Sequence, residues 1–145
     1  MDRTDREILR LLAQDGRLSY KDLGEAVHLS ANAVAERVRR LQGNGTIRHI
    51  RAVLDPAAMG RRLEAQIEVK LKSDTSALDF EAALRHMPQV VAATLMTGSF
   101  DYALRVACED QQELMTLTET LRRHGGVLDT YTRLILRDIH LSGLV

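Results

Sequence analysis

Apolar positions recur at helical spacing through the first 42 residues, in three short stripes. The stripes consist of Ile8, Leu9, Leu12 and Ala13, of Leu23 and Val27, and of Val34, Val38 and Leu41. A capping box of Thr4 and Glu7 would start the first helix, and Ser19 and Ser30 are placed to cap the next two. Asp15-Gly16, His28-Leu29 and Gly43 with Gly45 interrupt the stripes. The pattern therefore predicts three short helices within residues 2–42.

The second and third helices, within residues 19–47, have the spacing of a helix-turn-helix. At about 100° per residue, the polar side chains of the third helix fall opposite its apolar stripe, while Arg37 lies at the edge of that stripe. Asn, Glu and Arg can read bases or contact phosphates, so double-stranded DNA is the first partner to consider. Arg37 is better suited to a phosphate contact or an internal salt bridge. The predicted DNA-contacting residues are Ser30, Ala31, Asn32, Ala33, Glu36, Arg37, Arg39, Arg40 and Arg48. Alternatively, this is an ordinary amphipathic helix with a solvated charged face.

The stretch 46–55 is rich in β-branched and apolar residues and carries Arg48, His49 and Arg51. After a helix-turn-helix this composition indicates a wing, a strand or hairpin near the DNA backbone, although a simple connecting strand fits the same residues. Asp55-Pro56 and Gly60 then mark a boundary. We expect a winged helix-turn-helix domain over 1–51, a hinge over 52–62 and a second domain over 63–145.

Beyond the boundary the pattern changes to strands alternating with helices. Ala65–Leu71 alternates strictly, and residues 75–87 and 111–124 have helical periodicity. The apolar run over 90–97 predicts a buried strand. Gly98-Ser99-Phe100 is short enough for a hairpin, followed by a returning strand over 101–106 and a last strand over 127–140. The order β-α-β-β-α-β is ferredoxin-like, which makes the whole chain α+β. The apolar strands Val90–Met96 and Leu134–Ile139 imply a sheet-to-sheet or edge-to-edge dimer.

Composition adds support without deciding the function. The net charge is zero, but residues 1–51 hold 10 Lys and Arg against 7 Asp and Glu (+3), whereas residues 52–145 hold 10 against 13 (−3). A basic front half suits a polyanionic partner. The chain begins with charged residues rather than an apolar leader, and no apolar run approaches a membrane span. We therefore expect a cytoplasmic protein without membrane contact, in which the single Cys108 is a buried small hydrophobe.

No pattern of catalytic residues or metal ligands competes with this interpretation. The five histidines, at positions 28, 49, 86, 124 and 140, lack metal-ligand spacing. No nucleophile elbow or glycine-rich phosphate loop occurs. We expect no enzymatic activity, catalytic residue, metal or cofactor. The two remaining classes are a DNA-binding regulator and a small-ligand-binding oligomer whose helix-turn-helix is only structural.

The layout resembles the Lrp/AsnC (leucine-responsive, feast/famine) family of transcriptional regulators over essentially the whole chain. The matching stretches are DRTDREILRLLAQDGRLSYKDLGEAVHLSANAVAERVRRLQGNGTI, then RAVLDPAAMG at the hinge and TGSFDYALRV in the second half. The resemblance implies a sequence-specific DNA-binding domain and a C-terminal ligand-binding (RAM) domain that dimerises. It further implies dimers that assemble, often to octamers, and an amino-acid or related effector bound between dimers.

By the same resemblance, the effector site includes the loop Gly98, Ser99, Phe100, Asp101 and Tyr102. A hairpin glycine would let a ligand carboxylate approach backbone amides, and Asp101 could accept from an α-ammonium group. In the structural alternative, this is a tight turn in which Asp101 satisfies its own backbone. Ser99 and Phe100 stand where the family commonly has acidic or tyrosyl residues, and the residues of the predicted reading helix are those that vary. The effector and the operator sequence are therefore not carried over.

Overall fold

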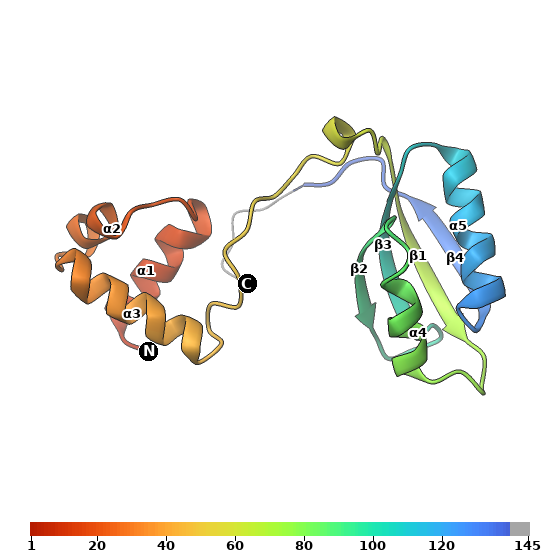
Figure 1. Cartoon of the computed structure of the whole chain (residues 1–145), viewed down its shortest axis with the longest axis horizontal. Helices are drawn as coiled ribbons and strands as arrows, with labels where there is room; N and C mark the ends of the chain where they lie inside the picture. Colours follow the sequence, from red (N-terminus) through yellow and green to blue (C-terminus); the bar gives the residue numbers. More distant parts are fainter. Residues whose placement is uncertain (140–145) are drawn as a thin grey trace. The chain divides into compact units, whose positions relative to one another are not determined.

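The computed structural model describes residues 1–139, which divide into two compact units, 1–53 and 54–139. The first unit contains three helices, α1 (Arg3–Gln14), α2 (Tyr20–Val27) and α3 (Ala31–Gly43) (Figure 1). Their apolar stripes meet in a small core of Ile8, Leu23, Val34 and Val38. The three predicted helices and the buried stripe of the third are thus confirmed.

The start of α1 differs from the prediction. Its capping box is formed by Asp2 and Asp5, not by Thr4 and Glu7: the Asp5 N–H donates to the Asp2 carboxylate at 2.7 Å, and the Asp2 N–H donates to the Asp5 carboxylate at 3.0 Å. Glu7 instead pairs with Arg10 on the exposed surface. The helix therefore begins two residues earlier than a cap at Thr4 would allow, and Asp5 becomes part of its first turn.

The predicted wing is wrong. Residues 48–55, all within the described chain, form neither a strand nor a hairpin. Their apolar side chains are largely exposed, with Val53 84% and Leu54 67% exposed. A strand requires a hydrogen-bonded neighbour, and no other segment within residues 1–53 supplies one, so β-branched composition alone does not produce it. Only a short 3-10 turn, η1 (Ala57–Met59), precedes the sheet.

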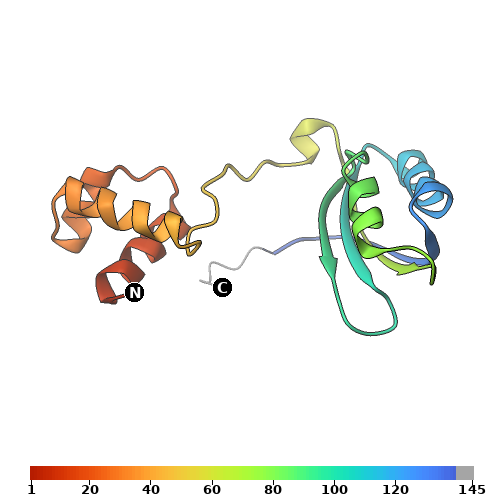
Figure 2. The same ribbon diagram turned by 60° about the horizontal axis from the view of Figure 1, so that its bottom comes forward.

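The second unit has the predicted order, β1 (Leu63–Leu71), α4 (Ala77–Leu84), β2 (Val90–Leu95), β3 (Tyr102–Cys108), α5 (Gln111–His124) and β4 (Val127–Leu134). The sheet order is β2-β3-β1-β4, and all three pairings are antiparallel. This is the ferredoxin-like arrangement, with α4 and α5 on the same face of the sheet (Figure 2). The last strand was expected to reach residue 140, but it ends at Leu134, and residue 140 lies outside the described residues.

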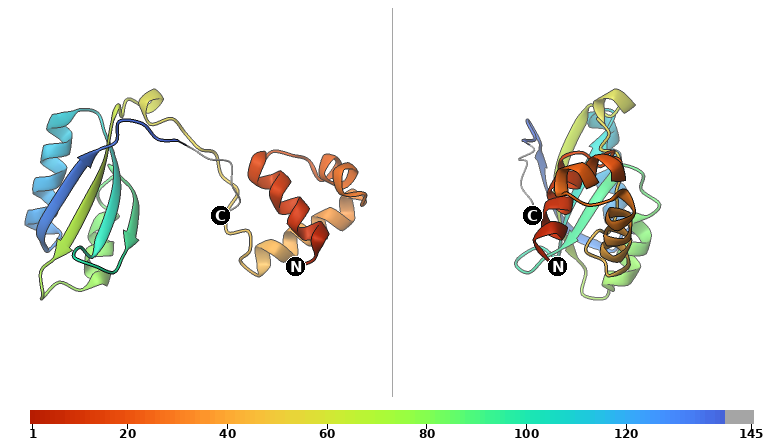
Figure 3. Two further views of the ribbon diagram at one scale, coloured as in Figure 1. Left: turned by 180° about the vertical axis from the view of Figure 1, so that it is seen from behind. Right: turned by 90° about the vertical axis from the view of Figure 1, so that its left-hand side faces the viewer.

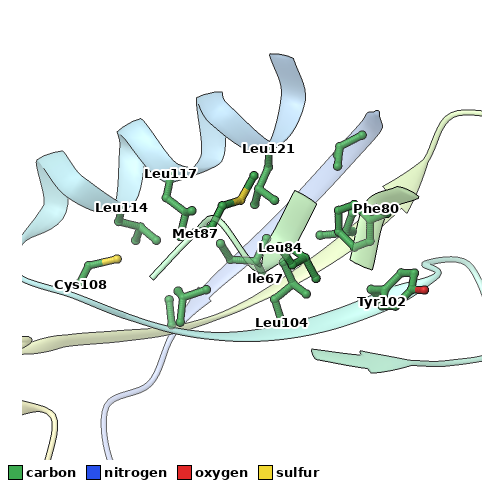
Figure 4. Close-up of a cluster of buried hydrophobic side chains, with 14 residues drawn as sticks. Ile67, Phe80, Leu84, Met87, Tyr102, Leu104, Cys108, Leu114, Leu117 and Leu121 are labelled. Atoms are coloured by element: carbon green, nitrogen blue, oxygen red, sulfur yellow. The ribbon is translucent and has the colours of Figure 1, made fainter. Parts of the chain in front are cut away.

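The core of this unit lies between the sheet and its two helices (Figure 4). Alternate residues of β1 and β3 point into it, where Leu114, Leu117 and Leu121 of α5 cover them. Phe80 of α4 packs against Tyr102 of β3, with ring centroids 4.8 Å apart. Cys108 is buried as predicted, and burial raises the pKa of its thiol to about 11. It is therefore a packed side chain rather than a nucleophile.

The run around Val90 is not the buried strand that its composition predicts. β2 forms one edge of the sheet, and Val91 and Leu95 are 53% and 61% exposed. The helix α4 has only eight residues and leaves this edge uncovered. At the opposite edge, residues 135–139 are not a strand either, and Leu136 is 95% exposed.

The sheet face opposite the helices is polar. Figure 3 (left) shows the sheet from behind, with its strands in front of α4. Salt bridges cross neighbouring strands on this face, from Arg105 to Glu64 and from Arg133 to Glu68, both at 2.8 Å. Such paired charges remain solvated in a single chain and can also meet a complementary surface.

Candidate DNA-contacting and ligand-binding sites

The connection between α2 and α3 is tight because three local features fit together. His28 ends α2 in the left-handed conformation, with φ at 58°. A Cβ on Gly24 would lie 2.5 Å from the Leu29 carbonyl oxygen, so only glycine allows this approach. Ser30 then caps α3 by accepting the Ala33 N–H at 3.2 Å. These contacts fix α3 against α2 as a helix-turn-helix.

The exposed face of α3 carries the side chains that the sequence predicts. Asn32, Glu36, Arg39 and Arg40 are exposed, and the small Ala31 and Ala33 leave the helix start accessible. Arg39 and Glu36 form a salt bridge one turn apart, and both side chains are 72% exposed. An exposed salt bridge contributes little free energy in water, so Arg39 can exchange Glu36 for another anion at small cost. Arg48 follows α3 and is also exposed, although no wing supports it.

Arg37 forms the internal salt bridge that was one of its two predicted roles. Its guanidinium donates to Asp2 at 2.6 Å and to Asp5 at 2.8 Å, and the side chain is only 27% exposed. Arg40, one turn further along, also donates to Asp5, at 2.9 Å. No sequence pattern singles out Asp5 as their partner, since 32 and 35 residues separate it from these arginines.

The Asp5 carboxylate is ionised in this setting. Burial alone would raise its pKa, but hydrogen bonds from the Asp2 amide and from Arg37, with the charge of Arg40, hold that pKa below its usual range. The pKa of Asp2 is lowered as well, by the Asp5 amide and by Arg37. Two carboxylates thus bind two guanidiniums at the junction of α1 and α3.

The predicted effector loop connects β2 to β3. Gly98 has φ at 121°, a conformation that favours glycine, and Gly98 and Ser99 are exposed while Phe100 is half-buried. The Asp101 carboxylate accepts hydrogen bonds from β1 and not from the backbone of its own turn. It accepts the Leu71 N–H at 2.8 Å and the Lys70 ammonium at 2.9 Å, and these two bonds lower its pKa.

Tyr102 points into the core rather than toward solvent (Figure 4). Its hydroxyl donates to Glu81 at 2.8 Å, and burial together with that carboxylate raises its pKa to about 12. Tyr102, although buried, is also among the residues that line an open hollow of about 790 Å³. The hollow is lined by Lys70, Leu71, Lys72, Ser73, Asp74, Thr75, Ala77, Leu95, Asp101, Tyr102 and Leu128.

Of the five predicted effector residues, only Asp101 and Tyr102 line this hollow. The lining does not include Gly98, Ser99 or Phe100. Sequence reasoning missed Lys72, Asp74 and Thr75, which follow β1. In the sequence they are ordinary polar residues of a loop, with no motif to mark them. Among residues 1–139, no group of His, Cys, Asp and Glu side chains could hold a metal ion.

The fold and these surfaces define a class of protein: a helix-turn-helix regulator with a separate ferredoxin-like domain. Two family models match, the AsnC-type helix-turn-helix domain over residues 1–42 and the Lrp/AsnC ligand binding domain over residues 64–145. The chain belongs to the Lrp/AsnC family of transcriptional regulators. It is a regulator and not an enzyme.

Named relatives agree with this assignment. The leucine-responsive regulatory proteins of Salmonella typhimurium and Escherichia coli K12 are each 34% identical over 98% of this chain and 88% of their own length. A transcriptional regulator from Neisseria meningitidis, solved with L-methionine, aligns at a TM-score of 0.89 with 32% identity, over 97% of this chain and 93% of its own. A feast or famine regulatory protein from M. tuberculosis, also with L-methionine, aligns at 0.90 with 30% identity over 97% and 95%.

Proposed function

We propose that this regulator binds double-stranded DNA through α3, at a pseudo-palindromic operator read by two copies. The observation that carries this proposal is the polar, cap-fixed face of α3 beside the tight α2–α3 turn. Its proposed contacts are Ser30, Ala31, Asn32, Ala33, Glu36, Arg39 and Arg40, with Arg48 on the following segment. Arg37, bound by two carboxylates, supports the helix instead.

The C-terminal unit would sense a small effector, an amino acid or a related metabolite. Two structural relatives were solved with L-methionine, which supports this class of ligand. The hollow beside Asp101 offers Lys72 to a carboxylate and Asp74 to an ammonium group, with Leu95 and Leu128 for an apolar side chain. Asp101 would position Lys70 and the loop over 96–101, because each of its oxygens already accepts one hydrogen bond. Each oxygen keeps a second acceptor site for the α-ammonium group of a ligand.

We further propose a homodimer built by the C-terminal unit, with dimers associating further, as far as an octamer. Support comes from the uncovered edge strand β2 and from the salt-bridged open face of the sheet, both of which can meet a second copy. Within residues 1–139 there is no helix long and apolar enough to cross a membrane. A cytoplasmic location follows from the proposed contact with DNA.

The test of DNA binding separates this proposal from its alternative, a ligand-binding oligomer with a merely structural helix-turn-helix. We expect Arg39→Ala with Arg40→Ala to weaken DNA binding and to reduce the slope of log affinity against log salt by about one unit per lost phosphate contact. Arg6→Ala with Arg10→Ala, on α1, removes the same charge and is the control. No affinity of the unaltered protein for DNA at low salt would favour the alternative.

The effector proposal is tested by calorimetry of the full chain against the standard amino acids. We expect Lys72→Ala and Asp74→Ala each to weaken the binding of whichever amino acid binds. Lys21→Ala and Asp22→Ala, on α2, are the matched controls. Binding that is unchanged in both hollow variants would exclude this hollow as the site.

A further inference from the structure

Among residues 1–139, Asp5 is the one charged side chain that is buried, with 1% of it exposed. Each of its oxygens accepts more than one hydrogen bond. Oδ1 accepts from Arg37 at 2.8 Å and from Arg40 at 3.0 Å, while Oδ2 accepts from Arg40 at 2.9 Å and from the Asp2 amide at 3.0 Å. Both guanidiniums come from α3, so this buried anion of α1 is directed at the DNA-contacting helix.

The two arginines use Asp5 differently. Arg37 is held by a second carboxylate, Asp2, and little of it reaches solvent. Arg40 places a single nitrogen, Nη2, on Asp5, and its side chain is 57% exposed. A guanidinium has five N–H donors, so Arg40, with one nitrogen on Asp5 and more than half of its side chain exposed, keeps further donors for a second anion.

We propose that Asp5 is a positioning residue for DNA binding, which holds the Arg40 guanidinium so that its outward N–H groups meet a backbone phosphate. The inference rests on the proposed function of α3. A free arginine loses much rotamer freedom when it binds, whereas Arg40 is already ordered by a charge-assisted bond. The arrangement carboxylate–guanidinium–phosphate alternates in charge, so Asp5 also offsets the repulsion between Arg37 and Arg40.

Arg39 provides the internal comparison. Its partner Glu36 is exposed and lies on the same helix, so nothing buried fixes the guanidinium. Arg39 can reach a phosphate, but it must be ordered when it does so. The two arginines therefore differ in preorganisation although both lie on the polar face of α3.

A double-mutant cycle tests the proposal. The probe is a DNA duplex that the wild-type full-length protein selects from a random-sequence library. We expect Asp5→Asn to weaken binding about tenfold in the wild type, as for loss of one charge-assisted contact, and less than twofold when Arg40→Ala is already present. An equal loss in both backgrounds would overturn the proposal, since a merely structural role does not depend on Arg40.

Controls separate folding from positioning. Asp2→Asn keeps a good N-cap and does not touch Arg40, so its DNA affinity should stay within about twofold of the wild type. Circular dichroism shows whether each variant is folded. If Asp5→Asn does not fold, Arg40→Lys tests the proposal with Asp5 intact. A lysine keeps the positive charge but lacks the guanidinium fork that bridges two anions. We therefore expect the DNA affinity of Arg40→Lys to resemble that of Arg40→Ala. Wild-type affinity in Arg40→Lys would refute the positioning.

Different experimental outcomes would refute this inference and the proposed function. If the wild-type protein selects no duplex from the library at low salt, DNA binding itself is refuted. If it selects one and the cycle is additive, only the role of Asp5 is refuted.

Discussion

At the scale of single residues, Asp101 joins the start of β3 to the end of β1. Its side chain accepts the Leu71 N–H and the Lys70 ammonium, and its own N–H donates to the Val69 carbonyl at 2.8 Å. The first two bonds favour the ionised carboxylate and lower its pKa relative to the unfolded chain. Part of the stability of the C-terminal unit therefore depends on this charge.

The sign of that dependence gives a prediction. A depressed folded-state pKa contributes stability above the unfolded value, about 3.9 for Asp, and the contribution is lost as the pH falls through the lower folded value. We expect the stability of the wild type to fall more steeply below about pH 4 than that of Asp101→Asn, in urea unfolding followed between pH 2.5 and 7. Asp129→Asn, at an exposed carboxylate of β4, is the control and should follow the wild type.

Gly24 offers a second prediction at this scale. A Cβ there would lie 2.5 Å from the Leu29 carbonyl, so the α2–α3 turn must open. The overpacking cost, about 1–3 kcal/mol, exceeds the gain of about 1 kcal/mol in helix propensity. We expect Gly24→Ala to lower the Tm of the N-terminal unit and to weaken DNA binding. Gly43→Ala has open space around its Cβ and should leave the Tm unchanged or raise it. A Tm of Gly24→Ala equal to that of Gly43→Ala would contradict the argument.

At the scale of elements, α5 supplies the largest helical contribution to the C-terminal core and begins at Asp110. The Asp110 carboxylate accepts the Glu113 N–H at 2.9 Å, and Glu113 in turn accepts the Glu109 N–H and the Gln89 amide. These last two bonds lower the pKa of Glu113. The start of the helix is thus fixed to the loop that precedes β2.

This cap can be tested by substitution. We expect Asp110→Ala to destabilise the C-terminal unit by about 1 kcal/mol, because the cap acceptor is lost. Asp110→Asn keeps an acceptor and should cost at most a few tenths of that amount. Thermal unfolding of both variants, followed by circular dichroism, makes the comparison. Equal losses in the two variants would assign the effect to charge rather than to capping.

Elements were predictable from the sequence where their cause is local. Ser19 and Ser30 cap their helices as predicted, because capping and helical periodicity involve residues three or four apart. The predictions of a wing and of a buried β2 were wrong, because the formation and burial of a strand depend on the segments that pair with it or cover it. In the candidate sites, the face of α3 followed from helical geometry. The binding of Arg40 by Asp5 and the hollow beside Asp101 depend on contacts about 30 residues apart, which periodicity does not encode.

At the scale of the whole molecule, each unit has its own core, and residues 48–55 between them have no regular structure. Within residues 1–53, the buried apolar side chains are Ile8, Leu23, Val34, Val38 and Leu41. The C-terminal unit carries the uncovered sheet edge and the salt-bridged face. The proposed function therefore places assembly in the C-terminal unit and DNA contact in the N-terminal unit.

If assembly and DNA contact belong to different units, the oligomeric state and the DNA affinity of separate fragments can be predicted. Residues 54–145 should keep the oligomeric state of the full chain in sedimentation, whereas residues 1–53 should sediment as a monomer. On a duplex selected by the full chain, the 1–53 fragment should bind 10²–10⁴-fold more weakly, because a dimer makes the second contact at high effective concentration. The salt slope of the fragment should also be about half that of the full chain, since one α3 rather than two meets the phosphates. Equal affinity of the fragment and the full chain would show that α3 acts singly, and the open sheet face would then have no part in DNA recognition.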